Sequence, residues 1–269
     1  MRINYILRDI AIWIEENKNI NISVYLIARI SGFSLWYLQR LFKARSGITL
    51  AKYIKLRKMT AAAVSLRISK KSIYNISKDL GYKTQSSFST AFSRCFGVTP
   101  TAFREEEYWS FEKMIHRYDY VQKIKHLQFE VIMDYEYNLI AADKEIVNLS
   151  RLLSPEQESR IYINVPKEKK HFFKNMEIEQ YYFLGGKERN KTIAMKFLSV
   201  QFCEPLGSLK KIQSLMYAGL LPALSITRRV GCDSINIKKN SAGEIIILNY
   251  IVPIKNLKPL DISYRRYES

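Results

Sequence analysis

The sequence predicts a mixed α and α/β chain: an all-α N-terminal domain with two helix-turn-helix units, followed by an α+β C-terminal domain. Three observations support this prediction. A segment of helical character occurs twice in the first 104 residues, and most of the excess positive charge lies in the same residues. Farther along, β-like runs such as FEVIMDYEY and EIIILNYIVPI are mixed with one helix-like stretch, GSLKKIQSLMYAGLL. We place the two domains at residues 1–107 and 118–269.

The repeated segment follows a first amphipathic helix, expected near Tyr5–Asn17 because apolar residues recur there with helical spacing. Its two copies are VYLIARISGFSLWYLQRLFKARSGIT and SIYNISKDLGYKTQSSFSTAFSRCFGVTP. Gly32 corresponds to Gly81 with an offset of 49, and Gly47 corresponds to Gly97 with an offset of 50. The second copy therefore has one extra residue in its turn.

Each copy has the pattern of a short helix, a glycine turn and a second helix. Gly32 and Gly81 stand where the first helix must end in a residue with positive φ, which glycine adopts without a steric cost. Ser34 is a good N-cap for the helix that follows. This is the helix-turn-helix arrangement, in which the first turns of the second helix can meet the edges of DNA bases.

A connecting helix is expected between the copies, in TLAKYIKLRKMTAAAVSLRI, which has no Pro or Gly and contains three consecutive alanines. About 20 residues at 1.5 Å each give roughly 30 Å, slightly less than the ~34 Å between successive major-groove faces of B-DNA. We therefore expect the DNA to bend or one unit to sit shallowly. Lys52, Lys55 and Lys58 are predicted to point outward. The apolar residues predicted to face inward are Leu50, Ile54, Ala61, Val64 and Ile68.

The net charge of +18 is distributed unevenly along the chain. Residues 1–104 contain 18 Lys and Arg against 4 Asp and Glu, a balance of +14, whereas residues 105–269 have a balance of +4. This asymmetry indicates a polyanionic partner for the N-terminal part alone. An anionic membrane is the competing polyanion, but the basic part lacks a single strongly amphipathic terminal helix with a bulky apolar outer face. Double-stranded DNA is the favoured partner.

Several other classes of protein fit the sequence poorly. No apolar run approaches the ~18 residues of a membrane span, and the N-terminus lacks the pattern of a signal peptide. Three widely separated cysteines favour a reducing compartment, so we expect a cytoplasmic, nucleoid-associated protein. The three histidines have no metal-ligand spacing, so no metal and no cofactor are expected. We find no hydrolase motif and expect no enzymatic activity.

The second helix of the first copy has an unusual outer face. Leu38, Leu41 and Phe42 form its apolar stripe. The other face has Trp36, Gln39, Arg40 and Lys43, of which the first three lie within the first two turns. These side chains combine apolar contact with the bidentate donors that distinguish bases. The alternative is that Trp36 is a core residue and the basic residues form an ordinary solvated face. Two copies within one strongly basic stretch favour DNA binding.

These segments resemble the AraC/XylS family of bacterial transcription activators and, within it, the MarA/SoxS/Rob group. The resemblance covers about Asn4–Arg104, through IARISGFSLWYLQRLFK, the AAAVSLRIS connector and the ending FGVTPTAFR. It implies a monomer bound to an asymmetric DNA site, with base contacts from Trp36, Gln39 and Arg40. It also implies RNA polymerase as a partner.

The second copy departs from the pattern of that group. Where the group has Gln, Gln, Thr, then Thr and Arg, this sequence has the run Gln85 to Thr90 with one Gln and the Arg lost. We expect Gln85 to contact a base and the neighbouring hydroxyls to contact phosphates. The expected contacts to the DNA backbone are Lys43, Lys58, Ser86, Ser87, Ser89, Thr90 and Arg94.

The C-terminal segments LPALSITRRVGCD and ILNYIVPIK resemble the end of the GyrI-like domain of Rob-type members. This resemblance implies an α+β fold with a small-molecule pocket, where a buried carboxylate among aromatic rings can hold a cationic or lipophilic effector. MEIEQYYF lies where the corresponding strand falls, and Glu177, Glu179 and Tyr181 share one face of it. The alternative is a solvated edge strand.

The sequence therefore predicts a sequence-specific DNA-binding transcription regulator. We expect an activator of stress, drug-resistance or virulence genes, whose C-terminal domain senses a ligand or a partner. Two alternatives stay open: a nucleoid protein indifferent to DNA sequence, and a GyrI-like drug-binding or hydrolytic protein with a DNA-binding appendage. Competition with nonspecific DNA tests the first, and ligand-turnover assays test the second.

Overall fold

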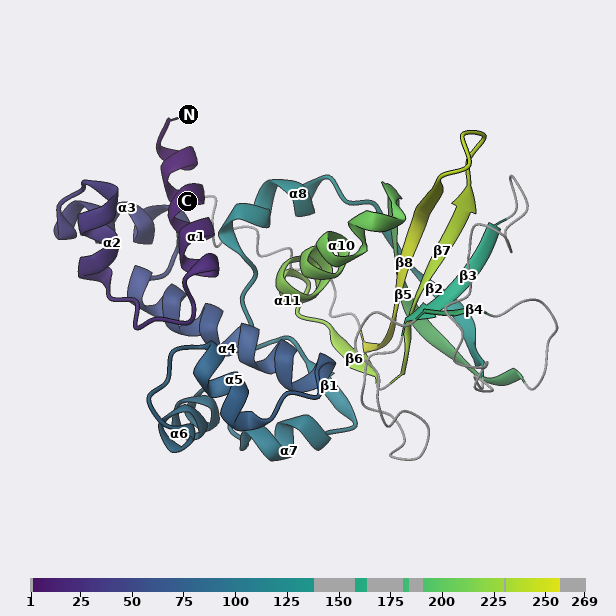
Figure 1. Cartoon of the computed structure of the whole chain (residues 1–269), viewed down its shortest axis with the longest axis horizontal. Coiled ribbons are helices and arrows are strands. Elements are labelled where there is room, and N and C mark those ends of the chain that lie inside the picture. The colour runs from purple at the N-terminus through teal and green to yellow at the C-terminus, as the bar shows by residue number, and fades with distance from the viewer. Residues whose placement is uncertain (1, 138–157, 164–180, 184–190, 230, 257–269) are drawn as a thin grey trace.

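A computed structural model describes residues 2–137, 158–163, 181–183, 191–229 and 231–256. Figure 1 shows a helical half at one end of the molecule, an antiparallel sheet at the other, and short helices between the two. Among the described residues, no helix is long and apolar enough to span a membrane.

The helical half consists of two groups of helices joined by the 19-residue helix α4 (Leu50–Ile68). We call α1, α2 and α3 with their connections the first unit, and α5, α6 and α7 with theirs the second unit (Figure 1). Helix α1 begins three residues before the predicted Tyr5–Asn17 and ends one residue before its end. The bounds are α1 Arg2–Glu16, α2 Val24–Ser31, α3 Leu35–Ser46, α5 Ile73–Asp79, α6 Gln85–Phe96 and α7 Pro100–Glu105.

The quoted β-like runs FEVIMDYEY and EIIILNYIVPI form strands, as the sequence predicted. The structure shows that these strands belong to one antiparallel sheet. Strand β8 pairs with β5 along one side and with β6 and β7 along the other. Beyond these, β2 pairs with β5, β3 with β7, β4 with β3, and β1 with β6. The bounds are β1 Tyr108–Ser110, β2 Phe129–Tyr137, β3 Glu158–Ile163, β4 Tyr181–Phe183, β5 Lys191–Pro205, β6 Thr227–Arg229, β7 Asp233–Lys239 and β8 Ile245–Asn256.

Short helices fill the space between the sheet and the helical half (Figure 1). The predicted helical stretch GSLKKIQSLMYAGLL forms η2, α10, a π-helical turn η3 and the start of α11. Leu209, Ile212 and Leu220 of this stretch are buried in the core that includes the sheet. The bounds are η1 Tyr118–Tyr120, α8 Val121–Lys125, η2 Leu206–Ser208, α10 Leu209–Leu215, η3 Met216–Leu220 and α11 Leu221–Ala223.

Helix α4 divides the apolar interior into two large clusters. Its N-terminal part, with Leu50 and Ile54, packs into the core of the first unit. Its C-terminal part, with Met59 and Leu66, belongs to a second core that continues through α6 and α7 to the sheet. The second unit and the C-terminal half therefore share one continuous core.

The prediction for the inner face of α4 is partly wrong. Leu50 and Ile54 are buried as predicted, but Ala61, Val64 and Ile68 are only half-buried. The buried residues of α4 surround most of its circumference because α5, α6, α7 and η3 all pack against it. Its buried residues are Leu50, Tyr53, Ile54, Arg57, Lys58, Met59, Thr60, Ala62, Ala63, Leu66 and Arg67.

The residues between the two predicted domains are packed into the molecule. Strand β1 pairs with β6 of the sheet, and Trp109 in it is fully buried. The indole stacks on Phe111, with ring centroids 4.4 Å apart, and on Tyr217, at 5.2 Å. The guanidinium of Arg67 in α4 lies 5.7 Å from the indole centroid. Trp109 thus contacts both α4 and η3.

Candidate nucleic-acid interface

Helix α3 is fixed by caps at both ends. The Ser34 hydroxyl accepts a hydrogen bond from the Tyr37 backbone N–H at 3.3 Å, which confirms the predicted N-cap. Gly47 ends the helix with φ of 70°, and Gly32 ends α2 with φ of 72°, as expected for its glycine turn. Leu38 is fully buried, which holds the opposite face of α3 toward solvent.

The exposed face of α3 carries the predicted base-contacting residues Trp36, Gln39 and Arg40, together with Lys43. Trp36 is 67% exposed, so the alternative that it is a core residue is wrong. The Arg40 guanidinium lies 5.2 Å from the Trp36 ring centroid, as a cation–π pair one helical turn apart. This contact orders an indole and a fork of N–H donors on one solvent-facing surface.

Helix α6 is capped in the same way but presents a different face. Thr84 is its N-cap, accepting from the Ser87 N–H at 3.1 Å, and Gly97 ends it with φ of 85°. Its buried side is aromatic, with Phe88 and Phe92 fully enclosed. The predicted DNA-facing residues are all exposed except Ser89, which is half-buried: Gln85, Ser86, Ser87, Ser89, Thr90 and Arg94.

The prediction that Lys58 points outward and contacts a phosphate is wrong. Its side chain is buried, and Nζ donates hydrogen bonds to the carbonyl oxygens of Ile20 at 2.6 Å and Leu80 at 2.9 Å. Burial lowers the pKa of the Lys58 ammonium, and the positive charge of Lys18 lowers it further. A charge pattern could not show this burial, because the covering residues lie in two other parts of the chain.

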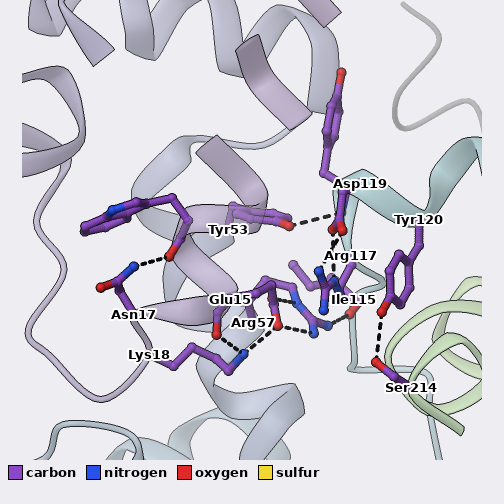
Figure 2. A network of polar contacts seen from close by, with 12 residues as sticks. Glu15, Asn17, Lys18, Tyr53, Arg57, Ile115, Arg117, Asp119, Tyr120 and Ser214 are labelled. Atoms are coloured by element: carbon purple, nitrogen blue, oxygen red, sulfur yellow. Dashed lines mark hydrogen bonds and ion pairs between the residues drawn. The ribbon is translucent and has the colours of Figure 1, made fainter. Parts of the chain in front are cut away.

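Next to Lys58, Arg57 is the centre of a buried ionic network (Figure 2). Its Nε and Nη2 donate to the two carboxylate oxygens of Glu15 at 2.6 and 3.2 Å. Lys18 donates to the same carboxylate at 2.6 Å. Burial raises the pKa of Glu15, but the charges and hydrogen bonds of Arg57 and Lys18 outweigh it and lower that pKa to about 2. The network joins α1 to α4.

The segment from Phe111 to Tyr120 connects the same network to the C-terminal half (Figure 2). Arg57 Nη1 donates to the Ile115 carbonyl, and the Ile115 N–H donates to the Thr60 hydroxyl at 3.1 Å. Farther along, the Tyr120 hydroxyl lies 2.9 Å from the Ser214 hydroxyl of α10. The segment is thus hydrogen-bonded both to α4 and to the helices that cover the sheet.

The predicted effector residues Glu177 and Glu179 lie outside the described residues, and Tyr181 begins β4 with its side chain also outside the description. The C-terminal half does contain a fully buried carboxylate, Asp233, which lies in the quoted run LPALSITRRVGCD.

Asp233 accepts hydrogen bonds from the hydroxyls of Tyr217 and Tyr250, each at 2.6 Å, and from the Arg228 guanidinium at 2.9 Å. Burial raises the pKa of both tyrosines, and the neighbouring carboxylate adds to the effect. The Arg228 cation already balances this carboxylate. We therefore assign Asp233 a structural role.

One repeated surface feature of the helical half was not predicted from the sequence. Tyr25 in α2 is 68% exposed and Tyr74 in α5 is 50% exposed, and the two correspond with the offset of 49. Each is followed four residues later by a cation, Arg29 or Lys78, and the Lys78 ammonium lies 5.0 Å from the Tyr74 ring centroid. The offset itself was the signal that could have identified this pair.

The helical half also matches known proteins in sequence. A family model described as a helix-turn-helix domain matches residues 27–106. The chain is 39% identical over 109 residues to the Transposon Tn10 TetD protein of Escherichia coli, a match that covers 40% of this chain and 79% of that protein. It is 40% identical over 99 residues to the regulatory protein SoxS of Escherichia coli, covering 37% of this chain and 92% of SoxS.

A longer relative matches over the same part of the chain. The right origin-binding protein of Escherichia coli is 34% identical over 105 residues, which cover 39% of this chain and 36% of that protein. These matches and the two capped helix-turn-helix units both identify the N-terminal half as a DNA-binding domain. The chain belongs to the MarA/SoxS/Rob group of the AraC family of sequence-specific, DNA-binding transcription regulators.

Proposed function

We propose that this regulator activates transcription as a monomer whose two helix-turn-helix units contact one asymmetric DNA site. The exposed face of α3, with Trp36, Gln39 and Arg40 on a helix capped at both ends, is the observation that carries the proposal. An indole and two bidentate donors in the first turns of such a helix are suited to base edges in the major groove.

The second unit contacts the DNA mainly through phosphates. Gln85 is the one residue at the start of α6 with a bidentate amide, and its neighbours have short hydroxyls that reach the backbone. Tyr25 in the first unit and Tyr74 in the second are further proposed backbone contacts, since the first helix of a helix-turn-helix unit crosses the DNA backbone. The proposed backbone contacts are Lys43, Ser86, Ser87, Ser89, Thr90, Arg94, Tyr25 and Tyr74.

The length of α4 supports binding of both units at once. Its 19 residues correspond to about 28 Å at 1.5 Å per residue. Successive major-groove faces lie ~34 Å apart, so a modest bend in the DNA brings both units into register.

The C-terminal half, residues 118–269, serves as an α+β regulatory domain of the GyrI-like class, next to the DNA-binding domain at residues 1–107. It senses a small lipophilic or cationic effector, with Glu177, Glu179 and Tyr181 as proposed pocket residues, and RNA polymerase is the proposed protein partner. The protein works in the cytoplasm at the nucleoid and has no enzymatic activity. The sheet with its covering helices supports the fold class of this half.

The experiment is a binding titration of the full chain on a DNA site found by genome-wide footprinting, at several salt concentrations. We expect a complex of one protein with one DNA site. In footprinting, two half-sites about one DNA turn apart should be protected. The slope of log association constant against log salt concentration should be about −0.9 per phosphate contacted. Affinity independent of salt, or binding only as a dimer, would contradict the proposal.

A further inference from the structure

The two units of the helical half contact each other directly, in addition to being joined by α4. Lys58, near the middle of α4, donates to the carbonyl of Ile20 at 2.6 Å and to the carbonyl of Leu80 at 2.9 Å. Ile20 lies between α1 and α2 in the first unit, and Leu80 is the C-cap of α5 in the second unit. One buried ammonium therefore holds the backbones of both units.

A second contact lies beside it, at Gly81. A Cβ atom added to Gly81 would lie 2.6 Å from the carbonyl oxygen of Asn19, a residue of the first unit. Gly32 occupies the equivalent place in the first copy and has the same φ of 72°, yet a Cβ added there would meet nothing within 4 Å. Gly81 is thus required both by its φ and by the close approach of the other unit.

Burying the Lys58 ammonium at this position costs free energy. The Lys58 side chain is 8% exposed, and its described hydrogen-bond acceptors are neutral carbonyls. Burying a cation against neutral groups costs more than packing an apolar side chain of similar length. An ammonium, however, offers donors that bind two carbonyls at defined positions, which an apolar side chain cannot do.

The contacts of Lys58 and Gly81 lie beside α4, away from its axis. An attachment at such a position restricts the rotation of one unit relative to the other about that axis. A single helix sets the separation of two units, but their rotation about its axis depends on other contacts. Rotation matters on DNA, because one base pair of extra spacing turns a half-site by about 34° at roughly 10.5 base pairs per turn.

We propose that Lys58, the carbonyls of Ile20 and Leu80, and the contact of Gly81 with Asn19 form a brace that sets the angle between α3 and α6. The brace selects the spacing of the two DNA half-sites, and Lys58 is a positioning residue that does not touch DNA. The inference depends on the proposed function in one respect, which is that both units meet the same DNA.

The first test measures the affinity of Lys58→Met for sites whose half-site spacing is natural, one base pair shorter or one base pair longer. We expect affinity for the natural spacing to fall about tenfold while the other two change less than about twofold, because loss of charged hydrogen bonds frees the angle. Lys55→Met is the matched control, since Lys55 is exposed on the same helix. Any change in affinity that it causes should be the same at every spacing. If Lys58→Met behaves like this control, the brace does not select spacing.

The second test needs no DNA and uses Gly81→Ala, with Gly32→Ala as its control. Both changes impose the same strain at φ of 72°, but only the first places a methyl against the other unit. Spin labels at Ala44→Cys in α3 and Thr90→Cys in α6, after replacement of Cys95, Cys203 and Cys232, report the distance between the units. We expect a shifted or broadened distance distribution in Gly81→Ala and in Lys58→Met, and a distribution like the wild type in Gly32→Ala.

The two tests separate the brace from the proposed function. An unchanged distance distribution in Gly81→Ala would overturn the brace, and this test decides the matter if Lys58→Met fails to fold. A changed distribution with footprint protection on only one half of the site would support the brace, overturn its role in spacing and overturn binding by both units.

Discussion

We expect Arg40 to recognise the base at one position of the DNA site. Arg40→Ala should relax discrimination at one position of the DNA site, because a bidentate Arg–guanine pair is worth about 1–3 kcal/mol against the wrong base. Affinity measured on the four single-base variants of that position checks this.

Lys43→Ala is the control for Arg40→Ala, since Lys43 is exposed on the same helix one turn farther on. As a phosphate contact it should weaken binding about equally on specific and random DNA and reduce the salt slope by about one unit. If both variants lose affinity uniformly, Arg40 contacts the backbone and base recognition lies elsewhere.

Glu15 should make stability depend on pH. Its pKa in the folded protein is about 2, against 4.5 for the free side chain, so the folded state favours the ionised carboxylate. The resulting stabilisation is fully present above pH 4.5 and is lost as the pH falls toward 2. About 2.5 pKa units correspond to roughly 3 kcal/mol in the free energy of unfolding.

Urea unfolding of wild type and Glu15→Gln between pH 2.5 and pH 7 measures this contribution. We expect the variant to be much less stable than wild type at neutral pH, and the difference to shrink below pH 4.5. Glu16→Gln, at the exposed neighbouring position, should follow wild type throughout. A constant difference between Glu15→Gln and wild type at all pH values would contradict the lowered pKa.

At the scale of whole elements, α3 and α6 should contribute unequally to recognition. The DNA-facing side of α3 has an indole, an amide and a guanidinium, whereas that of α6 has mainly hydroxyls. Hydroxyls cannot make the bidentate pattern that separates guanine from adenine. Selection of binding sites from random DNA should yield one sharply specified block and one loosely specified, AT-rich or bendable block about a turn away.

If α6 is unspecific because it lacks bidentate side chains, adding such side chains should make it more specific. Ser86→Gln with Thr90→Arg introduces bidentate donors at exposed positions of that helix, so we expect the second block to become sharper. Ser86→Gln with Thr90→Lys adds the same charge without the guanidinium fork and should raise affinity more than specificity. Two equally sharp blocks for the wild type would show that α6 already reads bases fully.

For the whole molecule, we expect cooperative unfolding, because the second unit and the C-terminal half share one core and α4 contributes to this core and to that of the first unit. The second unit, Trp109 and the sheet share one apolar cluster, and segment 111–120 adds hydrogen bonds to both halves. We expect one calorimetric transition for the wild type. Trp109→Ala should lower the free energy of unfolding by about 3–5 kcal/mol, because it removes a fully buried ring of the sheet that contacts α4 and η3.

Trp109→Phe is the matched variant, since it keeps an aromatic ring to stack on Phe111 and Tyr217. It should lose less stability than Trp109→Ala and keep the single transition. Two separate transitions in the wild type, with only one of them shifted by Trp109→Ala, would show that the halves fold independently.

Much of the helical half could be predicted from the sequence because its determinants are local. Ser34 caps the helix that starts at the next residue, and Gly32 needs only its own backbone angle to end α2. The exposure of Trp36 and Arg40 follows from the spacing of Leu38 and Phe42 on the same helix. The duplication added independent evidence, since one pattern occurring twice identifies the unit.

The tertiary structure alone decided the role of residues whose partners are far away in sequence. Lys58 and Lys55 look alike in the connecting helix, yet Lys58 bonds to residues 38 and 22 positions away, and Arg57 bonds to Glu15 42 positions away. Gly32 and Gly81 have the same φ, but only Gly81 lies against another unit. Helical spacing predicts which side of a helix a residue occupies, whereas burial depends on which distant segment covers that side.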